Sequence, residues 1–426
     1  MSASYLAQLR KLIDKSICRP EEFVPGKSRI PLMVPSYGTD EILEAMDSLL
    51  QTKVTMGEKV EKFEKLFSEY IGVGNAIMVN SGSSANLVAL SVLASKSLSE
   101  PIRPGDEIIT PAVAWSTTIF PIYSVGAVPV FVDVDLTTFT VDVDAVKGAV
   151  TDRTRAIIPV HLLGNPCNMK ELSAVAETHD LFLVEDACEA HGAETNGKRV
   201  GAFGDLSTFS FFFSHHISTI EGGMVLTNDV QYADAARSLR AHGWIRERSD
   251  AAQLAARYPL LDKRFLFVSQ GYNLRPTEIQ GAFGIHQIKK LEEFIRIRIQ
   301  NADYWTKELD GFSNYLSLPR YEAGARHVYF GYPVTVRSDA PFTREQMTSF
   351  LESRGIETRP VMSGDMTQHP AMSDLPYRIA GSLNNSRIIH SRSFFWANHH
   401  GIGSPQREFI VSAVRDFIRE KVEKSK

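Results

Sequence analysis

A short aromatic segment of this chain ends in two consecutive histidines, whose side chains are suited to proton transfer. Residues 209–214 comprise four phenylalanines and two serines, and His215 and His216 follow them. An imidazole takes up and releases a proton near neutral pH, so it can act as a general base or acid. It lacks the primary amine with which a lysine forms a Schiff base. This segment contains no lysine, and none occurs anywhere between Lys198 and Lys263.

Two adjacent histidines also raise the question of a metal site. We predict a strand over residues 207–213 that leads into them, and neighbouring side chains of a strand point to opposite faces. Both imidazoles therefore cannot easily ligate one ion. The sequence predicts no metal here, with His215 facing a site and His216 serving a structural role.

Small residues join a predicted strand, 76–80, to a predicted helix, 84–96. Gly82 and Ser83 lie at this junction. Backbone N–H groups at a helix N-terminus favour an anion, and small side chains let it approach closely. The junction is a candidate phosphate cradle, and an ordinary helix cap is the plainer alternative.

Acidic and aromatic residues follow two further predicted strands. Asp186 comes directly after the apolar strand 181–185, and Glu189 follows three residues later. A carboxylate there could keep the nitrogen of a pyridine-type cofactor protonated, so that the ring accepts electrons. Trp115, after the strand 107–110, could stack on such a ring. A turn or cap for Asp186, and a core position for Trp115, are the alternatives.

These residues depend on a framework of alternating strands and helices. Strands are predicted at 76–80, 107–110, 128–134, 156–160, 181–185, 207–213 and 223–227, with helical patterns between them such as 170–179. This alternation is typical of an α/β fold with a mostly parallel sheet and helices on both faces. Sites in such sheets form at the carboxyl ends of strands.

Three parts of the chain are predicted. Residues 1–30 form an N-terminal extension with a helix over 5–17 that packs on the main body, residues 31–284 a large domain, and residues 285–426 a smaller α+β domain. A long helix is expected over 277–309, a strand over 328–336, and helices over 343–354 and 404–421.

Composition excludes several classes of function. The 426 residues carry a net charge of −4, which does not suggest a nucleic-acid or membrane-surface partner. No stretch approaches the length of a membrane span, and the first 15 residues lack a signal-peptide core. Three cysteines are too few and too scattered for a disulfide framework or an iron–sulfur cluster. We expect a cytoplasmic protein.

The spacing of these motifs resembles the DegT/DnrJ/EryC1 family of nucleotide-sugar enzymes, which has the aspartate-aminotransferase fold. His215 lies five residues after Ser210 and six before Glu221, where that family has its cofactor lysine, and Asp186 lies 24 residues before Ser210. The resemblance covers roughly residues 31–400. Its further segments are 55–58, 111–118, 162–166, 240–244, 271–276, 357–360 and 398–400.

The resemblance implies a pyridoxal or pyridoxamine phosphate cofactor that is not covalently bound. Its implied contacts are Gly82, Ser83, Trp115, Asp186, Glu189 and Ser210, and Asn273 reaching across a homodimer to the neighbouring cofactor. Glu357 and Arg359 are implied to face the substrate. The cysteine cluster of an iron–sulfur branch would fall within residues 244–270, which contain no cysteine.

A histidine at the lysine position marks the sugar 3-dehydratases of this family. The implied reaction removes the C3 hydroxyl of a nucleotide-linked 4-keto-6-deoxyhexose, with His215 moving the proton and glutamate restoring the cofactor amine. GDP-4-keto-6-deoxy-D-mannose is the expected substrate, and a CDP- or dTDP-sugar is the alternative. A nucleotide-sugar aminotransferase and a non-catalytic protein of this fold are the other two hypotheses.

Overall fold

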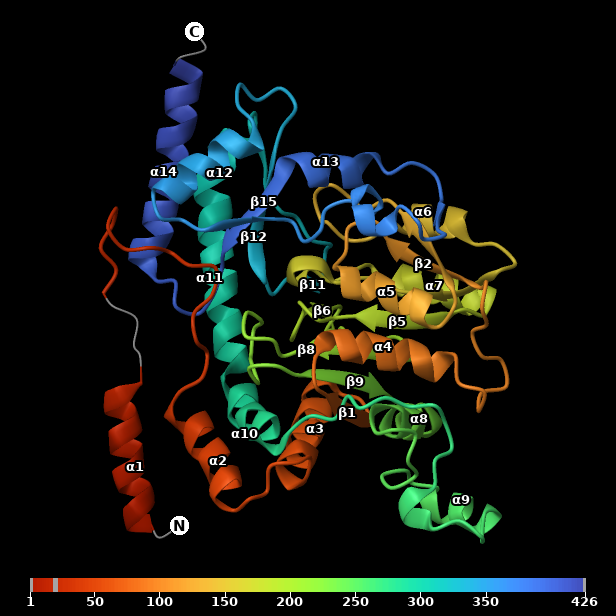
Figure 1. The fold of residues 1–426 in the computed structure, drawn as a ribbon. Helices are drawn as coiled ribbons and strands as arrows, with labels where there is room; N and C mark the ends of the chain where they lie inside the picture. Colours follow the sequence, from red (N-terminus) through yellow and green to blue (C-terminus); the bar gives the residue numbers. More distant parts are fainter. Residues whose placement is uncertain (1–2, 18–21, 424–426) are drawn as a thin grey trace.

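A large, mostly parallel sheet forms the centre of the molecule (Figure 1). The structure is a computed structural model that describes residues 3–17 and 22–423. In this part of the chain the sheet has eight strands, in the order β1 (Asn75–Val79), β9 (Gly223–Thr227), β8 (Leu206–Ser210), β5 (Phe182–Asp186), β4 (Thr154–Ile157), β2 (Glu107–Pro111), β3 (Val128–Val132) and β14 (Arg378–Ile379). Only β9 runs antiparallel to its neighbours. The predicted α/β class and mostly parallel sheet are confirmed.

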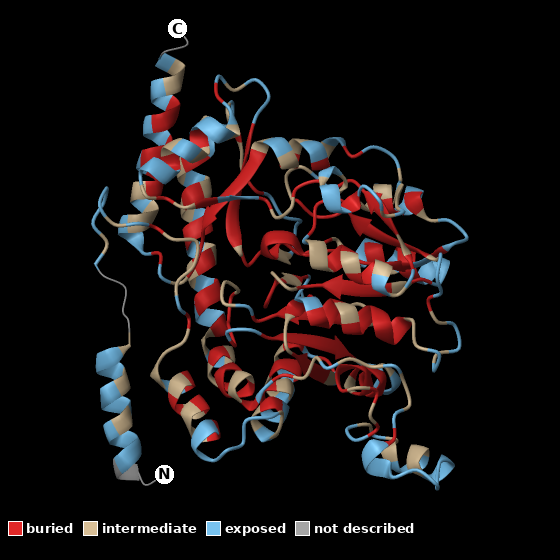
Figure 2. Cartoon of the chain, viewed as in Figure 1, coloured by how far each residue is buried: buried red, intermediate tan, exposed pale blue. Residues whose placement is uncertain are grey.

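Alternate residues of the strands pack on opposite layers of helices. Ile108 and Val184 face one core, with α4 (Gly82–Leu93) and α8 (Val230–Arg240). Their neighbours along the two strands, Ile109 and Leu183, face a second core, with α6 (Val143–Ala149) and α7 (Met169–His179). This alternation follows from the period of two in a strand. Both faces of the sheet are therefore apolar and covered (Figure 2).

Further helices precede the smaller domain. They are α2 (Thr39–Leu50), α3 (Glu58–Ile71), α5 (Ser116–Ser124) and α9 (Ala251–Arg257), of which α9 has no buried residue. Phe63 and Phe67 of α3 are fully buried against Phe209 and Phe211. The chain around β8 is thus fixed by aromatic packing on the side away from α4.

A smaller antiparallel sheet forms a second core. Its strands follow the order β10 (Leu316–Ser317), β12 (Gly331–Val336), β15 (Ser393–Ala397) and β13 (Thr358–Pro360). The helices α11 (Leu291–Leu309), α12 (Arg344–Ser353) and α14 (Ser404–Glu423) contribute to this core, while α13 (Asn384–Arg392) precedes β15. Trp305 and Trp396 are fully buried at its centre. A short third sheet joins β11 (Ala325–Arg326), β6 (Glu194–Thr195) and β7 (Lys198–Arg199).

The long helix expected over 277–309 is interrupted. Residues Glu278–Gln287 form α10, a 3₁₀ turn follows at Ile288–Lys290, and α11 begins at Leu291. The division of the chain at residue 284 stays a prediction. The two parts are tied together, because β14 returns to the large sheet and Arg378 pairs with the buried Glu107 at 2.7 Å.

The N-terminal helix is present as α1 (Ala3–Ser16), but it is not buried as its apolar pattern predicts. Tyr5 and Leu12 are 66% and 61% exposed, and no described side chain of α1 is buried. Its contact is with α2, where Arg10 pairs with Asp40 at 2.7 Å. Arg19 and Pro20, which are expected to break the helical pattern, lie outside the described residues. Of the helices described, none is long and apolar enough to cross a membrane.

Candidate active site

A cavity of about 490 Å³ lies between the carboxyl ends of the large sheet and the smaller sheet. Eight of the residues predicted for the site line it: Gly82, Ser83, Trp115, Asp186, Glu189, Ser210, His215 and Arg359. The small sheet contributes Phe395 and the adjoining Phe330 to the opposite wall. Two predicted residues, Asn273 and Glu357, do not line it. The predicted clustering of these side chains at strand ends is therefore seen in the geometry.

The candidate phosphate cradle forms where α4 begins against the end of β8. Ser81 caps α4, and its Oγ accepts a hydrogen bond from the Ser84 N–H at 3.1 Å. A Cβ atom added to Gly82 would lie 2.5 Å from the Cβ of Ser210. Only glycine therefore lets the helix N-terminus meet the Ser210 hydroxyl this closely. Backbone N–H groups and a hydroxyl converge as an anion requires.

Asp186 ends β5 on the floor of the cavity and is 4% exposed. One carboxylate oxygen accepts hydrogen bonds from Thr118 Oγ1 at 2.7 Å and Asn86 Nδ2 at 3.0 Å. The other accepts the Cys188 N–H at 3.2 Å. This second oxygen keeps an acceptor position for a donor in the cavity. Neither Asn86 nor Thr118 is predicted from the sequence as a site residue, although Asn86 lies in the predicted helix 84–96 and Thr118 in the segment 111–118.

Glu189 is a carboxyl held in an apolar part of the cavity. Burial raises its pKa to about 8, the Leu163 N–H at 2.8 Å opposes that rise, and the charge of Asp186 adds to it. The side chain is therefore protonated at neutral pH and can donate a hydrogen bond.

His215 lies in a turn after β8, not on a strand. The predicted strand 207–213 is too long, because β8 ends at Ser210 and the chain turns, with the His215 N–H donating to the Phe212 carbonyl at 3.0 Å. Because the two histidines do not lie on a strand, the alternation of strand side chains does not exclude a metal ion shared by them. No group of three or more His, Cys, Asp or Glu in the described residues has a metal-binding arrangement.

The His215 ring is enclosed on one side and open on the other. Its Nδ1 is buried without a hydrogen-bond partner, and the Phe330 ring lies 5.2 Å from it between centroids. Burial, and then the charge of Arg298, lower the pKa of His215 to about 3. The imidazole is thus neutral at neutral pH, as a general base must be before it acts. His216 is fully buried, and its Nε2 lies 3.1 Å from the Val328 carbonyl.

Trp115 stands at the cavity mouth and is 55% exposed. The alternative that it is a core residue is therefore wrong. Phe212, on the loop before His215, lines the same cavity and is 42% exposed. Two aromatic faces are available for a planar ring.

The two predicted residues outside the cavity have other contacts. Asn273 is exposed, and its Oδ1 accepts a hydrogen bond from Arg275 Nε at 3.0 Å. Glu357 accepts the Leu32 N–H at 2.9 Å and lies 3.5 Å from the Arg359 guanidinium. Arg359 is the one arginine or lysine among the described residues that line the cavity.

The free cysteines do not suggest cluster chemistry. Cys167 is buried in the core, and Cys188 lines the cavity, where burial raises the pKa of its thiol well above the usual value. Cys18 lies outside the described residues. The absence of an iron–sulfur cluster stays a prediction.

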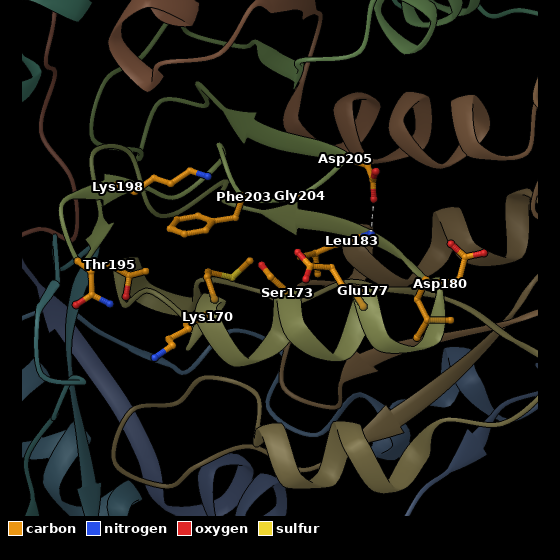
Figure 3. A pocket seen from close by; sticks show the side chains of 14 residues that line it. Lys170, Ser173, Glu177, Asp180, Leu183, Thr195, Lys198, Phe203, Gly204 and Asp205 are labelled. Atoms are coloured by element: carbon orange, nitrogen blue, oxygen red, sulfur yellow. Dashed lines mark hydrogen bonds between the residues drawn. The ribbon is translucent and has the colours of Figure 1, made fainter.

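A second hollow, of about 740 Å³, lies between α7 and the β6–β7 hairpin (Figure 3). Its lining includes Lys170, Lys198 and Asp205, and the Asp205 carboxylate accepts the Leu183 N–H at 2.8 Å. It is larger than the cavity at His215, but it holds none of the residues predicted for the site. Chemistry and not size therefore selects the first cavity.

The sheet, the small domain and the cavity between them define the aspartate-aminotransferase fold class, here with histidine in place of a cavity lysine. Residues 36–415 match the family described as the DegT/DnrJ/EryC1/StrS aminotransferase family. The chain belongs to this family, and the predicted membership is confirmed.

Two curated relatives are similar over most of the chain. A dTDP-4-dehydro-2,6-dideoxy-D-glucose 3-dehydratase of Saccharopolyspora spinosa is 40% identical, covering 93% of this chain and 88% of the relative. A GDP-4-keto-6-deoxy-D-mannose 3-dehydratase of Yersinia pseudotuberculosis is 38% identical, covering 87% and 94%. A crystal structure of GDP-4-keto-6-deoxymannose-3-dehydratase with a trapped PLP-glutamate geminal diamine is 34% identical, with a TM-score of 0.82 over 90% of this chain and 99% of that chain.

Proposed function

We propose that this chain removes the C3 hydroxyl of a nucleotide-linked 4-keto-6-deoxyhexose, with pyridoxamine phosphate as its cofactor. The observation that carries the proposal is the composition of the cavity. His215 and Asp186 line it together with the phosphate cradle, and no lysine is among the described lining residues. A site that holds an electron-accepting cofactor ring but has no lysine to bind that cofactor covalently favours elimination of the hydroxyl over amination of the sugar.

The residues of the cavity fit this cofactor. The α4 N-terminus, Gly82 and Ser210 offer N–H and hydroxyl donors to a phosphate, and Asp186 Oδ1, which accepts the Cys188 N–H, has a further acceptor position for a ring nitrogen. Trp115 offers a face for stacking, and protonated Glu189 offers a further donor. When bound, the cofactor supplies an amine for the C4 keto group and a ring that accepts electrons.

Within this arrangement His215 transfers the proton. With cofactor and substrate bound, its neutral imidazole would accept a proton at the cofactor carbon that carries the amine nitrogen, and it would return that proton to the C3 oxygen, which would leave as water. One group can serve first as base and then as acid, and such transfer contributes about 10²–10⁴-fold to a rate. Asp186 maintains the ring protonation that draws the electrons away. Arg359 and Glu357 are proposed to orient the substrate from the small domain.

The proposed partners follow from the same relatives. The solved structure with a PLP-glutamate adduct supports glutamate as the amino donor. The relatives support both a GDP- and a dTDP-sugar, and GDP-4-keto-6-deoxy-D-mannose is proposed as the first substrate to test. We also propose a homodimer, in which exposed Asn273 reaches the neighbouring site.

The test is to mix the purified protein with pyridoxamine phosphate, glutamate and GDP-4-keto-6-deoxymannose, and to analyse the sugar by mass spectrometry. Loss of the C3 oxygen is expected. An aminated sugar would instead assign the aminotransferase activity that the family name carries. If the GDP-sugar is unchanged, the dTDP- and CDP-sugars follow, and failure of all three would contradict the proposal.

A further inference from the structure

A buried arginine lies behind His215 without a carboxylate to balance its charge. Arg298, on α11, is 3% exposed. Its Nη1 donates hydrogen bonds to three carbonyls, those of Tyr329 at 3.2 Å, Phe330 at 2.9 Å and Asn398. Burial alone lowers its pKa to about 9, so no described acidic residue compensates the charge. A buried guanidinium bound only to carbonyls is costly, which suggests a role beyond packing.

The backbone at Tyr329 is shaped to meet this guanidinium. Tyr329 has a φ of +48°, in the left-handed region that bulky residues rarely adopt. The φ and ψ angles of a residue set the direction of its carbonyl relative to the preceding one. The left-handed residue therefore turns the Tyr329 carbonyl, which accepts from Arg298 Nη1, relative to the Val328 carbonyl, which lies 3.1 Å from His216 Nε2. Asn398 completes the arrangement, because its Nδ2 donates to the Arg298 carbonyl at 3.0 Å.

Phe330 connects this buried group to the reacting side chain. Its ring lies 5.2 Å from the His215 ring and 6.2 Å from the His216 ring, between centroids. Its N–H donates to the Leu163 carbonyl at 2.8 Å, while the Leu163 N–H donates to Glu189. The wall that supports His215 is therefore held from behind by Arg298 and from the side by the loop at Leu163.

The same guanidinium also acts on the charge of the histidines in front of it. Burial and the positive charge of Arg298 both lower the pKa of His215 and of His216. His191, 6.0 Å from His215 between ring centroids, has its pKa lowered by burial, then by His215 and Arg298. The other titratable groups that line the cavity around His215 are Asp186, Cys188, Glu189, Glu221 and Arg359.

We propose that Arg298 is a positioning residue for His215: it fixes the Phe330 wall against the imidazole, and its unbalanced charge disfavours a second positive charge there. His215 is thereby kept neutral and in place before the substrate arrives. The inference rests on the proposed role of His215 as the base. It assigns to the small domain a part in setting the protonation of a side chain carried by the large one.

The first test follows the protonation of His215 directly, without cofactor or substrate. The protein is labelled with ¹³Cε1-histidine, and the His215 signal is assigned by its loss in the His215→Asn variant. Arg298→Met should raise the midpoint of the His215 titration by at least about one pH unit, equivalent to a tenfold change in its protonation constant. Arg298→Lys, which keeps the charge, should leave the midpoint near that of the wild type.

The second test separates position from charge in the dehydration reaction. Phe330→Leu keeps Arg298 but removes the ring, and it should lower kcat while leaving the His215 midpoint closer to wild type than Arg298→Met does. In Arg298→Met, kcat/KM should decline at a higher pH on its acidic side, because protonated His215 cannot accept a proton. Val334→Ala, in the buried core of the small sheet, is the control for lost stability.

An unchanged His215 midpoint in folded Arg298→Met would overturn the inference. If Arg298→Met does not fold, a Lys variant whose midpoint rises as far as expected for Met would also overturn it, because charge would then be irrelevant. Failure of the proposed function has a different signature: wild-type protein dehydrates no nucleotide sugar, while the titration experiment still reports on Arg298.

Discussion

His215 is the side chain on which the proposed chemistry depends. The structure places it in the wall of the cavity with Nδ1 buried, and none of the described lining residues is a lysine. The neighbouring Asp186 has one oxygen engaged by two side chains and the other available. At the scale of single residues, the proposal therefore makes two separable claims, one about a base and one about a ring-nitrogen partner.

His215→Lys should abolish dehydration, because a primary amine captures the aldehyde form of the cofactor covalently. His215→Asn should lose the base while keeping the fold, with kcat lowered by about 10²-fold or more. Mass spectrometry of the sugar and circular dichroism of the variants check both expectations. Continued formation of 3-deoxy product by the Lys variant, or near-normal turnover by the Asn variant, would remove His215 from the mechanism.

Asp186→Asn should lower kcat by about 10²-fold or more, because a neutral amide no longer stabilises a protonated ring nitrogen. Thr118 can still donate to the amide oxygen, so the melting temperature should change little. Steady-state kinetics and thermal unfolding measure the two effects. A fall in melting temperature large enough to account for the loss of kcat would mean that Asp186 is only a structural residue.

At the scale of elements, α4 and β8 meet at the candidate phosphate cradle. The helix N-terminus supplies N–H groups, and the strand end supplies the Ser210 hydroxyl. The two can touch because Gly82 has no side chain. The turn after β8 then brings His215 back to the same cavity.

Gly82→Ala should weaken cofactor binding by about tenfold or more, equivalent to about 1.4 kcal/mol, because the new Cβ would force α4 away from Ser210. Equilibrium titration of pyridoxal phosphate absorbance measures the dissociation constant. Gly148→Ala, in α6 with open space around the added Cβ, is the matched control and should bind normally. Normal binding by the Gly82 variant would exclude this cradle as the phosphate site.

At the scale of the whole molecule, six histidines near the two sheets have a lowered pKa and are neutral at neutral pH. Burial is the first cause of the lowered pKa of His191, His215, His216, His327, His399 and His400. These residues lie around the region where the large sheet meets the small domain. The protonation state of this region is therefore coupled to the integrity of the fold.

The free energy of unfolding should fall as the pH is lowered from about 6.5 towards 4. The unfolded chain binds protons on these histidines near their ordinary pKa of about 6.5, whereas the folded chain does not, so acid favours unfolding. Each such histidine contributes up to about 1.4 kcal/mol per pH unit to the slope. Urea unfolding at three pH values measures it.

Two substitutions test the origin of that slope. His399→Asn removes one buried group and should make the slope shallower, while His179→Asn changes an exposed histidine and should not. An unfolding free energy that is flat between pH 6.5 and 5 would contradict the burial of these side chains in solution.

The fold class, the main strands and the motifs with chemistry follow from the sequence alone, because short apolar runs and the residues at their ends are local signals. The sequence located Gly82, Asp186, Ser210 and His215 without showing how close together they lie. Local pattern was misleading for α1, whose apolar residues stay exposed, and for residues 211–216, where an aromatic run continues after the strand has ended.

The surroundings of those residues depend on contacts that form only in the folded chain. The contacts of Asn86 and Thr118 with Asp186, of Phe330 with His215, and of Arg298 with three carbonyls join segments tens to hundreds of residues apart. The raised pKa of Glu189 and the lowered pKa of His215 likewise arise from burial in the closed fold. Residue types set which protons can move, but desolvation by distant segments sets where those protons reside.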